Sequence, residues 1–182
     1  MYKTLVPRDA SRLVGGGQIV TVASVSKEGV PDCMTAAWNT AYDSDQVLVV
    51  LDLGHTTTRN ILDTGKFVVG IPDESLVKEI LKVGSEHGRV TGDKFKWAGI
   101  APEKSAKLGI DVIPGQMAYI ECELGDKDVF EKTGVAIGKA VNITVKEELW
   151  DDESSSFGKG YQHNLHYVSG EVFCTGGTLI KV

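Results

Sequence analysis

Short runs of β-branched and other apolar residues recur along this chain, and turn-forming residues separate them. The runs at 18–26, 47–51 and 67–71 are rich in valine and isoleucine, as is typical of strands. Glycine accounts for 21 of the 182 residues, well above the usual ~7%. This pattern predicts a mainly β chain of about six or seven strands with glycine-rich turns and two helices at its periphery. Such a chain removes its sheet edges by closing into an antiparallel barrel.

The details of three strands can be predicted from turns and from periodicity. Turn chemistry at 27–32 predicts that the first strand returns through 33–41 as a hairpin. Residues 118–124 alternate, and the period of two predicts that Ala118 and its even-numbered neighbours face inward. In 135–145 most of the larger apolar residues are odd-numbered, which predicts that the odd-numbered face is buried.

Two helices follow from capping signals and periodicity, and a short segment could add a third. A helix over 57–63 would have a threonine as its N-cap, and Gly65 would end it. A second helix should begin at Asp73 and end at Gly84. A short third helix is expected over Lys94–Ala98.

Composition limits the class of protein. At 182 residues, the chain is expected to form a single domain over 1–182. A formal net charge of −6 argues against binding to a nucleic-acid backbone. Cys33, Cys122 and Cys174 do not have disulfide or metal-ligand spacing, and no metal site is predicted. The sequence has neither an apolar run of 18 residues nor a secretory signal pattern, so we expect a cytoplasmic protein without a membrane role.

The segment His55-Thr56-Thr57-Thr58-Arg59 has the features of an anion site. The N-terminus of a helix offers free backbone N–H groups and a partial positive charge. Threonine hydroxyls would add donors, and His55 and Arg59 could add positive charge, which together suit a phosphate monoester. Threonine is also simply a good N-cap, so the segment alone leaves both interpretations open.

A second segment, Thr35-Ala36-Ala37-Trp38, is compatible with a planar ligand. Two consecutive small residues on a strand let a flat ring approach the backbone. They can equally make room for a neighbouring side chain in the core. Trp38 can pack in the core or lie against the ligand.

The order of these motifs resembles the flavin reductase-like, FMN-binding split-barrel family that includes flavoredoxin. The resemblance rests on Thr35-Ala36-Ala37-Trp38, the apolar strand that follows, the threonine-rich turn with Asn60-Ile61, and Thr64-Gly65-Lys66-Phe67-Val68-Val69 with Ile71-Pro72. Shorter matches are Val22-Ala23-Ser24, Gly29-Val30-Pro31-Asp32, Val83-Gly84, Gly88, Asp93-Lys94-Phe95, Gly99-Ile100, Leu165-His166-Tyr167 and Gly170. The resemblance implies an antiparallel FMN-binding split β-barrel.

The resemblance also implies which residues bind the cofactor. In such proteins the strand matching 35–40 contacts the isoalloxazine and ribityl parts of FMN, and the turn matching 52–60 holds the ribityl chain and phosphate. The implied FMN-binding residues are Thr35, Ala36, Ala37, Trp38, Asn39, Thr40, Asp52, His55, Thr56, Thr57, Thr58, Asn60 and Lys94. Such barrels pair into homodimers with the flavin near the interface, which would bring Lys94 to the flavin of a partner subunit. His55 departs from the family pattern, which leaves its role open.

The implied function is that of an oxidoreductase. An NAD(P)H-dependent flavin reductase would pass hydride from nicotinamide to flavin N5, and this chemistry needs no catalytic acid, base or nucleophile from the protein. His163 and His166 could touch either ring or be structural. The alternative is a flavoredoxin-type electron-transfer protein, whose acidic surface would meet a redox protein partner. A third hypothesis is a non-redox binding module on the same barrel.

Overall fold

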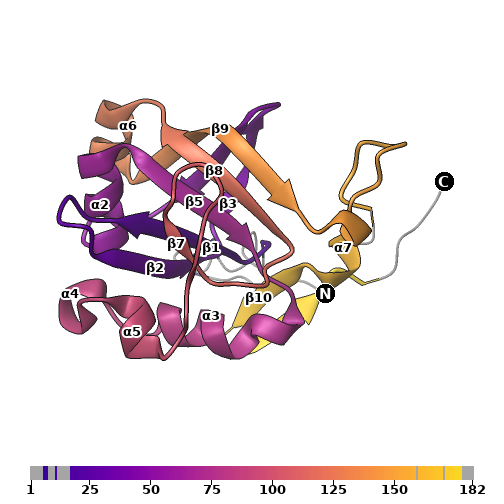
Figure 1. The fold of residues 1–182 in the computed structure, drawn as a ribbon, viewed down its shortest axis with the longest axis horizontal. Coiled ribbons are helices and arrows are strands. Elements are labelled where there is room, and N and C mark those ends of the chain that lie inside the picture. The colour runs from indigo at the N-terminus through magenta and orange to yellow at the C-terminus, as the bar shows by residue number, and fades with distance from the viewer. Residues whose placement is uncertain (1–5, 8–10, 12–16, 159, 170, 178–182) are drawn as a thin grey trace.

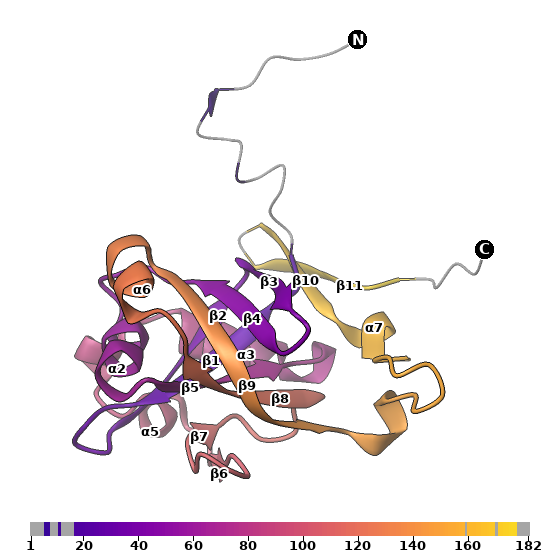
Figure 2. The same ribbon diagram turned by 90° about the horizontal axis from the view of Figure 1, so that it is seen from above.

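A computed structural model describes residues 6–7, 11, 17–158, 160–169 and 171–177. Its main feature is a seven-stranded antiparallel sheet in the order β2-β1-β5-β8-β9-β4-β3. The strands are β1 (Val20–Val25), β2 (Pro31–Ala36), β3 (Asn39–Asp43), β4 (Gln46–Val50), β5 (Lys66–Ile71), β8 (Ala118–Leu124) and β9 (Val135–Val145). Short helices lie around the sheet (Figures 1 and 2). The mainly β, split-barrel architecture is therefore confirmed.

The sheet curls because its two edge strands are consecutive in the chain. Only Ala37 and Trp38 separate the end of β2 from the start of β3. Three residue steps span at most about 11 Å, so the two edges must lie close together at this point. The predicted hairpin of β1 and β2 is confirmed, with Val20 opposite Ala36. The return strand does not run on to Ala41, however, because β3 pairs with β4 on the other edge.

The prediction for the buried face of β9 holds only beyond a β-bulge in its pairing with β8, where the register shifts between Glu121 and Cys122. Before the bulge, Ala136 and Gly138 are buried, so the even-numbered face is the inner one. Beyond it, the odd-numbered Ile143 and Val145 lie opposite Ile120 and Ala118 on the inner face, although Ile143 is 61% exposed. Phe67 of β5 is fully buried, and a Cβ on Gly138 would lie 2.4 Å from its ring. The small residues of β9 thus face inward because a neighbouring aromatic ring fills the core beside them.

Glu121 of β8 is a second difference from the predicted pattern, because it is only 1% exposed although it lies on the expected outer face. Its carboxylate accepts hydrogen bonds from the backbone N–H groups of Lys107 and Leu108 and from Asn142 Nδ2. Burial by itself would raise the pKa of Glu121, but these donors outweigh it and the pKa lies below its usual value. A strand period cannot predict such a carboxylate, because its partners come from a distant loop.

The three predicted helices are present and differ from the prediction at one cap, whereas three further helices, α4 (Gly88–Thr91), α6 (Lys127–Thr133) and α7 (Gly160–His163), were not predicted. The predicted short helix is α5 (Lys94–Ala98), and Asp73 caps a 3-10 turn (Glu74–Leu76) that leads into α3 (Val77–Gly84). Helix α2 (Thr56–Thr64) ends at Gly65, which adopts a left-handed conformation with φ 70°. Its N-cap is His55 and not a threonine.

The remaining elements lie at the periphery of the sheet. They are α4 (Gly88–Thr91), β6 (Glu103–Lys104), β7 (Asp111–Val112), α6 (Lys127–Thr133), a 3-10 turn (Glu147–Leu149), α7 (Gly160–His163), β10 (Leu165–Ser169) and β11 (Val172–Thr175). Helices α3 and α5 pack against β2, α4 contacts α2 and α5, and all three lie below the sheet in Figure 1. None of the helices in the described ranges is long and apolar enough to cross a membrane.

Candidate functional site

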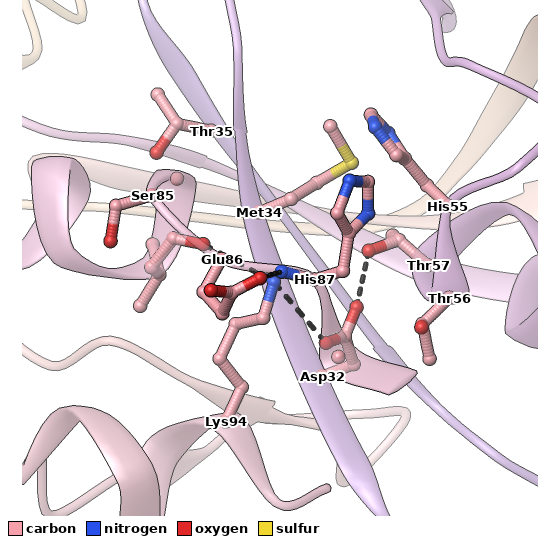
Figure 3. Close-up of a pocket in the computed structure, with 13 residues that line it drawn as sticks. Asp32, Met34, Thr35, His55, Thr56, Thr57, Ser85, Glu86, His87 and Lys94 are labelled. Atoms are coloured by element: carbon pink, nitrogen blue, oxygen red, sulfur yellow. Dashed lines mark hydrogen bonds and ion pairs between the residues drawn. The ribbon is translucent and has the colours of Figure 1, made fainter. Parts of the chain in front are cut away.

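A pocket of about 150 Å³ lies where β2 meets the start of α2 and the segment that links α3 to α5 (Figure 3). The predicted residues Thr35, His55, Thr56, Thr57 and Lys94 all line it. The structure therefore brings together residues from the strand segment, the threonine-rich turn and the Asp-Lys-Phe motif. These segments lie up to about 60 positions apart in the chain, so the fold and not the local sequence assembles the pocket.

A buried ion pair lies in this pocket. Lys94 Nζ is 3.5 Å from Asp32 Oδ1, and the two side chains are only 4% and 2% exposed. Lys94 Nζ also donates a hydrogen bond to the carbonyl of Val83 at 3.2 Å, and the Thr57 hydroxyl donates to Asp32 Oδ2. Asp32 therefore connects the start of α2 to the start of α5. Lys94 does so within its own chain, whereas the resemblance assigns it to the flavin of a partner subunit.

The first turn of α2 opens onto the same pocket. Its backbone N–H groups have no partner within the helix, so they can bind an anion. The hydroxyl of Thr58, like that of Thr57, is already engaged: it donates to the carbonyl of Asp52 at 2.7 Å. Thr56 is less buried than either and lines the pocket. Of the three threonines, Thr56 is thus the best placed to offer its hydroxyl to a ligand.

Two histidine rings lie next to one another at one side of this pocket. His55 and His87 each occupy an N-cap position without a side-chain cap, and their ring centroids are 5.1 Å apart. The Nδ1 atom of His55 is buried and has no hydrogen-bond partner. Burial lowers the pKa of His55, and His87 and Lys94 lower it further, against the opposing effect of Asp52 and Asp32. His55 is therefore neutral near pH 7.

A second, apolar pocket of about 350 Å³ adjoins the first and shares Thr35, Gly84 and Ser85 with it. Ala37 lines this pocket. On the side of the C-terminal hairpin β10–β11, Tyr167 and Phe173 line it with rings that meet edge to face at 5.9 Å. Together the two pockets offer a charged compartment beside an aromatic, apolar one.

Other predicted residues lie outside the charged pocket. Ala36 is buried in the core, and Trp38 is 58% exposed, so Trp38 does not pack in the core. Asn39 donates to the carbonyl of Gln18 at 2.7 Å and, with Thr40, lines a separate groove. The other predicted residues lie in α2 or just before it. Asn60 of α2 donates a hydrogen bond to Ser24 at 3.1 Å, and Asp52 before α2 accepts one from the Gly54 N–H at 2.7 Å. Arg59 of α2 is exposed.

The two remaining candidate histidines lie in the C-terminal region. His163 Nδ1 is 3.1 Å from Glu74 Oε1 on the surface, and it lines neither of these two pockets. His166 of β10 pairs with Gln18 in an isolated bridge. Within the described part of the chain, no group of three or more histidine, cysteine or acidic side chains could hold a metal ion.

Several residues of the charged pocket were not predicted from the sequence to line a site. Asp32 and Gly88 belong to motifs that carry the family resemblance, and Ser85, Glu86 and His87 had no predicted role. Gly88 leaves little room, since a Cβ there would lie 2.4 Å from Asp32 Oδ1. The glycine-rich segment 84–88 was the one available signal, because close approach of backbone to a side chain favours glycine.

A further apolar groove of about 550 Å³ lies at the edge of the main core, on the face of the sheet that carries Ile71 and Ala118. Ile120, Ile143 and Val145 line it from β8 and β9, and Trp150 and Tyr161 line it from the segments that follow. Three of these side chains, Ile143, Trp150 and Tyr161, are more than 40% exposed. So much exposed apolar surface in one place is typical of an interaction face.

Comparison with known proteins identifies the family. Residues 14–170 match the family described as flavin reductase like domain. An uncharacterized protein of Methanothermobacter thermautotrophicus is 25% identical over 172 residues, spanning 90% of this chain and 81% of the relative. One from Pyrococcus abyssi is 28% identical over 120 residues, spanning 65% and 68%.

Two solved structures show the same fold. An FMN-binding domain of a flavin reductases-like enzyme from Shewanella baltica has a TM-score of 0.81 at 23% identity, covering 99% of this chain and 96% of that one. Flavoredoxin of Desulfovibrio vulgaris has a TM-score of 0.81 at 22% identity, covering 100% and 97%. With the family match over most of its length, this chain belongs to the flavin reductase-like domain family.

Proposed function

We propose that this protein is an FMN-binding oxidoreductase that works as an NAD(P)H-dependent flavin reductase. The observation that carries the proposal is the pair of adjoining pockets. One holds a buried lysine and the N-terminus of α2, and the other holds apolar and aromatic side chains. A ligand with a phosphate at one end and a flat ring at the other matches this division. The FMN-binding proteins among the structural neighbours support the same ligand.

The donors of the charged pocket fit a phosphate monoester. Lys94 supplies an ammonium group, the first turn of α2 supplies backbone N–H groups, and Thr56 supplies a hydroxyl. Asp32 Oδ1 is buried without a hydrogen-bond partner and is available to a hydroxyl donor, such as one on a ribityl chain. On this proposal the phosphate end lies near Lys94 and the ring lies in the apolar pocket with Ala37, Tyr167 and Phe173.

Several of the remaining predicted residues would contribute to FMN binding indirectly, by holding the elements that line the two pockets in place. Thr57, Thr58, Asn60 and Asp52 fix the start of α2 by hydrogen bonds, and thereby orient its N–H groups. Thr35 donates to the carbonyl of Ile80 at 2.6 Å and holds β2 against α3, where the two pockets meet. Four predicted residues line neither of these two pockets and would contact FMN only from the end of β2 and the start of β3. They are Ala36, Trp38, Asn39 and Thr40.

The protein contributes binding and orientation to the reaction. Bound FMN would supply the hydride and electron chemistry. The chain's own residues would hold the cofactor by charge and hydrogen bonds, and the aromatic pair of the C-terminal hairpin, which lines the apolar pocket, would exclude water from the bound ring. Cys33 and Cys122 are buried, and burial raises the pKa of the Cys122 thiol to about 12, so neither thiol is a nucleophile near neutral pH.

A flavoredoxin-type electron carrier is the second candidate function. The flavoredoxin of Desulfovibrio vulgaris among the structural neighbours and the net charge of −6 favour it. An acidic surface attracts a basic redox partner over long range. This candidate uses the same FMN site and differs only in the source and destination of the electrons.

We also propose that the protein forms a homodimer. The exposed apolar groove that includes Ile143 and Trp150 supports this proposal, because burying apolar surface against a second copy stabilises the pair. An Ile143→Asp variant should then be monomeric by light scattering, with unchanged circular dichroism. A dimer that survives this change would move the interface elsewhere.

The experiment that tests the function begins with the flavin content of the purified protein and a titration with FMN. Oxidation of NADH or NADPH is then followed with FMN present. Saturable FMN binding with steady nicotinamide oxidation is the expected result. Tight FMN binding without turnover would instead favour the electron carrier. A protein that neither contains flavin nor changes the spectrum of added FMN would refute both functions and leave the non-redox binding module.

A further inference from the structure

The charged pocket has less positive charge than its lysine suggests. Asp32 lies 3.5 Å from Lys94 and offsets its charge, and Glu86 adds a second carboxylate to the pocket lining. The start of α2 contributes only a partial charge of about half a unit. A phosphate monoester carries nearly two negative charges above pH 7. At neutral pH the pocket therefore lacks enough positive charge to match it.

Two groups in the described lining of the pocket can supply the difference. Among the described residues that line this pocket, His55 and His87 are the ones that can gain a positive charge. Figure 3 shows their rings next to one another, on the side of the pocket where α2 begins. His55 Nδ1 is buried without a partner, so it is free to bond to a ligand oxygen.

We propose that His55 and His87 together bind the phosphate group of FMN and take up a proton as they do so. This inference rests on the proposed function, since it concerns the same site. A dianion placed beside an imidazole favours the charged form of that ring. The added positive charge, together with Lys94 and the N-terminus of α2, would then balance the negative charge of the phosphate.

The surroundings of the pair explain why the proton is held only when the ligand is bound. His87 and Lys94 oppose protonation of His55, whereas Asp52 before α2 and Asp32 on β2 favour it. Glu86 lies beside His87 and accepts the hydrogen bond of its backbone N–H at 2.9 Å. Burial has the largest effect and favours the neutral form of His55 in the free protein. A bound phosphate group would favour the protonated form instead.

The histidine pair would also affect which flavin the protein binds more tightly. Riboflavin lacks the phosphate and would bind without proton uptake, with an affinity that does not change between pH 7 and 8.5. For FMN, uptake of one proton makes the dissociation constant rise by up to about tenfold per pH unit. The protein would thus favour a terminal phosphate over the uncharged ligand most strongly at lower pH.

The test is calorimetric titration of the wild-type protein with FMN at pH 7.5. Using buffers with different ionisation enthalpies gives the number of protons bound. We expect uptake of roughly half to one proton per FMN and none with riboflavin. His55→Asn and His87→Asn should each reduce the uptake, and the double variant should abolish it and weaken FMN binding at least about fivefold. His163→Asn, which changes a surface histidine paired with Glu74, is the matched control and should behave as wild type.

The outcomes separate the two proposals. FMN binding without proton uptake, or with an uptake that the double variant retains, would overturn the role of the histidine pair and leave the flavin function intact. A wild-type protein that does not bind FMN would overturn both. Circular dichroism checks that each variant is folded. If the double variant does not fold, the wild-type proton count and His87→Gln decide the matter.

Discussion

Lys94 and Asp32 form an ion pair at 3.5 Å that is almost completely buried, with side chains 4% and 2% exposed. The pair joins β2 to α5, while Thr57 ties the same aspartate to α2. A buried charge is tolerated when it is paired and hydrogen-bonded, and it becomes costly when its partner is removed. The stability of the barrel's edge and the charge of the pocket therefore depend on the same two residues.

Removing the lysine should destabilise the protein strongly. Lys94→Met leaves Asp32 as a buried, uncompensated charge, which should lower the free energy of unfolding by about 3–5 kcal/mol. Lys27→Met is the matched control. It breaks the pair of Lys27 with Asp63, which has a distance of 3.2 Å but lies on the surface, and should change stability by less than about 1 kcal/mol. Urea unfolding measures both. Equal losses would show that the buried pair is worth no more than the exposed one.

Substitution of two neighbouring threonines should have different effects, one on the stability of the fold and the other on FMN binding. Thr57→Val removes the hydroxyl bonded to buried Asp32 and should lower the free energy of unfolding by about 1–3 kcal/mol. Thr56→Val should leave stability within about 0.5 kcal/mol and weaken FMN binding several-fold. Denaturant unfolding and flavin fluorescence titration test the pair. If Thr56→Val binds FMN as tightly as wild type, its hydroxyl has no part in the site.

Glu121 should make stability fall in acid. Its pKa is depressed in the folded protein, so the folded state binds this proton less readily than the unfolded chain. The resulting stabilisation is complete above the ordinary glutamate pKa of about 4.3 and is lost as the pH falls through the folded value. Glu121→Gln should therefore show a smaller loss of stability between pH 6 and pH 3 than wild type. Glu123→Gln, an exposed change in the same strand, should keep the wild-type dependence. Identical curves for all three proteins would rule out Glu121 as the source.

Thiol reactivity should distinguish the three cysteines. Cys33 and Cys122 are buried and burial raises the pKa of each thiol, whereas Cys174 on β11 is exposed. An aromatic disulfide reagent at pH 8 should thus react rapidly with one thiol per native chain and with all three after denaturation. Cys174→Ser should remove the rapid phase. A rapid phase that persists in this variant would mean that a buried cysteine becomes accessible.

The elements of the fold were largely predictable because each leaves a local signal. The strands at β5 and β8 and the helix at α5 follow from apolar runs, periodicity and capping residues. The change of buried face within β9 was not predictable, because it depends on a β-bulge in the pairing with β8 and on Phe67 occupying the space next to Gly138. The burial of Glu121 likewise depends on donors at 107–108 that pair with it only in the folded chain.

The site was predictable in part for the same reason. The helix start at 55–58 has a chemical signature in the sequence, and Lys94 was reached only through the family resemblance. Asp32 and His87 have no such signature. Their importance comes from burial beside Lys94 and from a ring distance of 5.1 Å to His55, and both are properties of the assembled structure.

The central claim is that the charged pocket binds the phosphate end of FMN, and a comparison of FMN with riboflavin tests it most directly. Both ligands are titrated into the flavin-free protein at pH 7 and followed by flavin fluorescence. Charge-assisted hydrogen bonds contribute about 1.5–3 kcal/mol each, so FMN should bind at one site per chain and at least about tenfold more tightly than riboflavin. Equal affinities for the two ligands, or no binding of FMN, would contradict the claim.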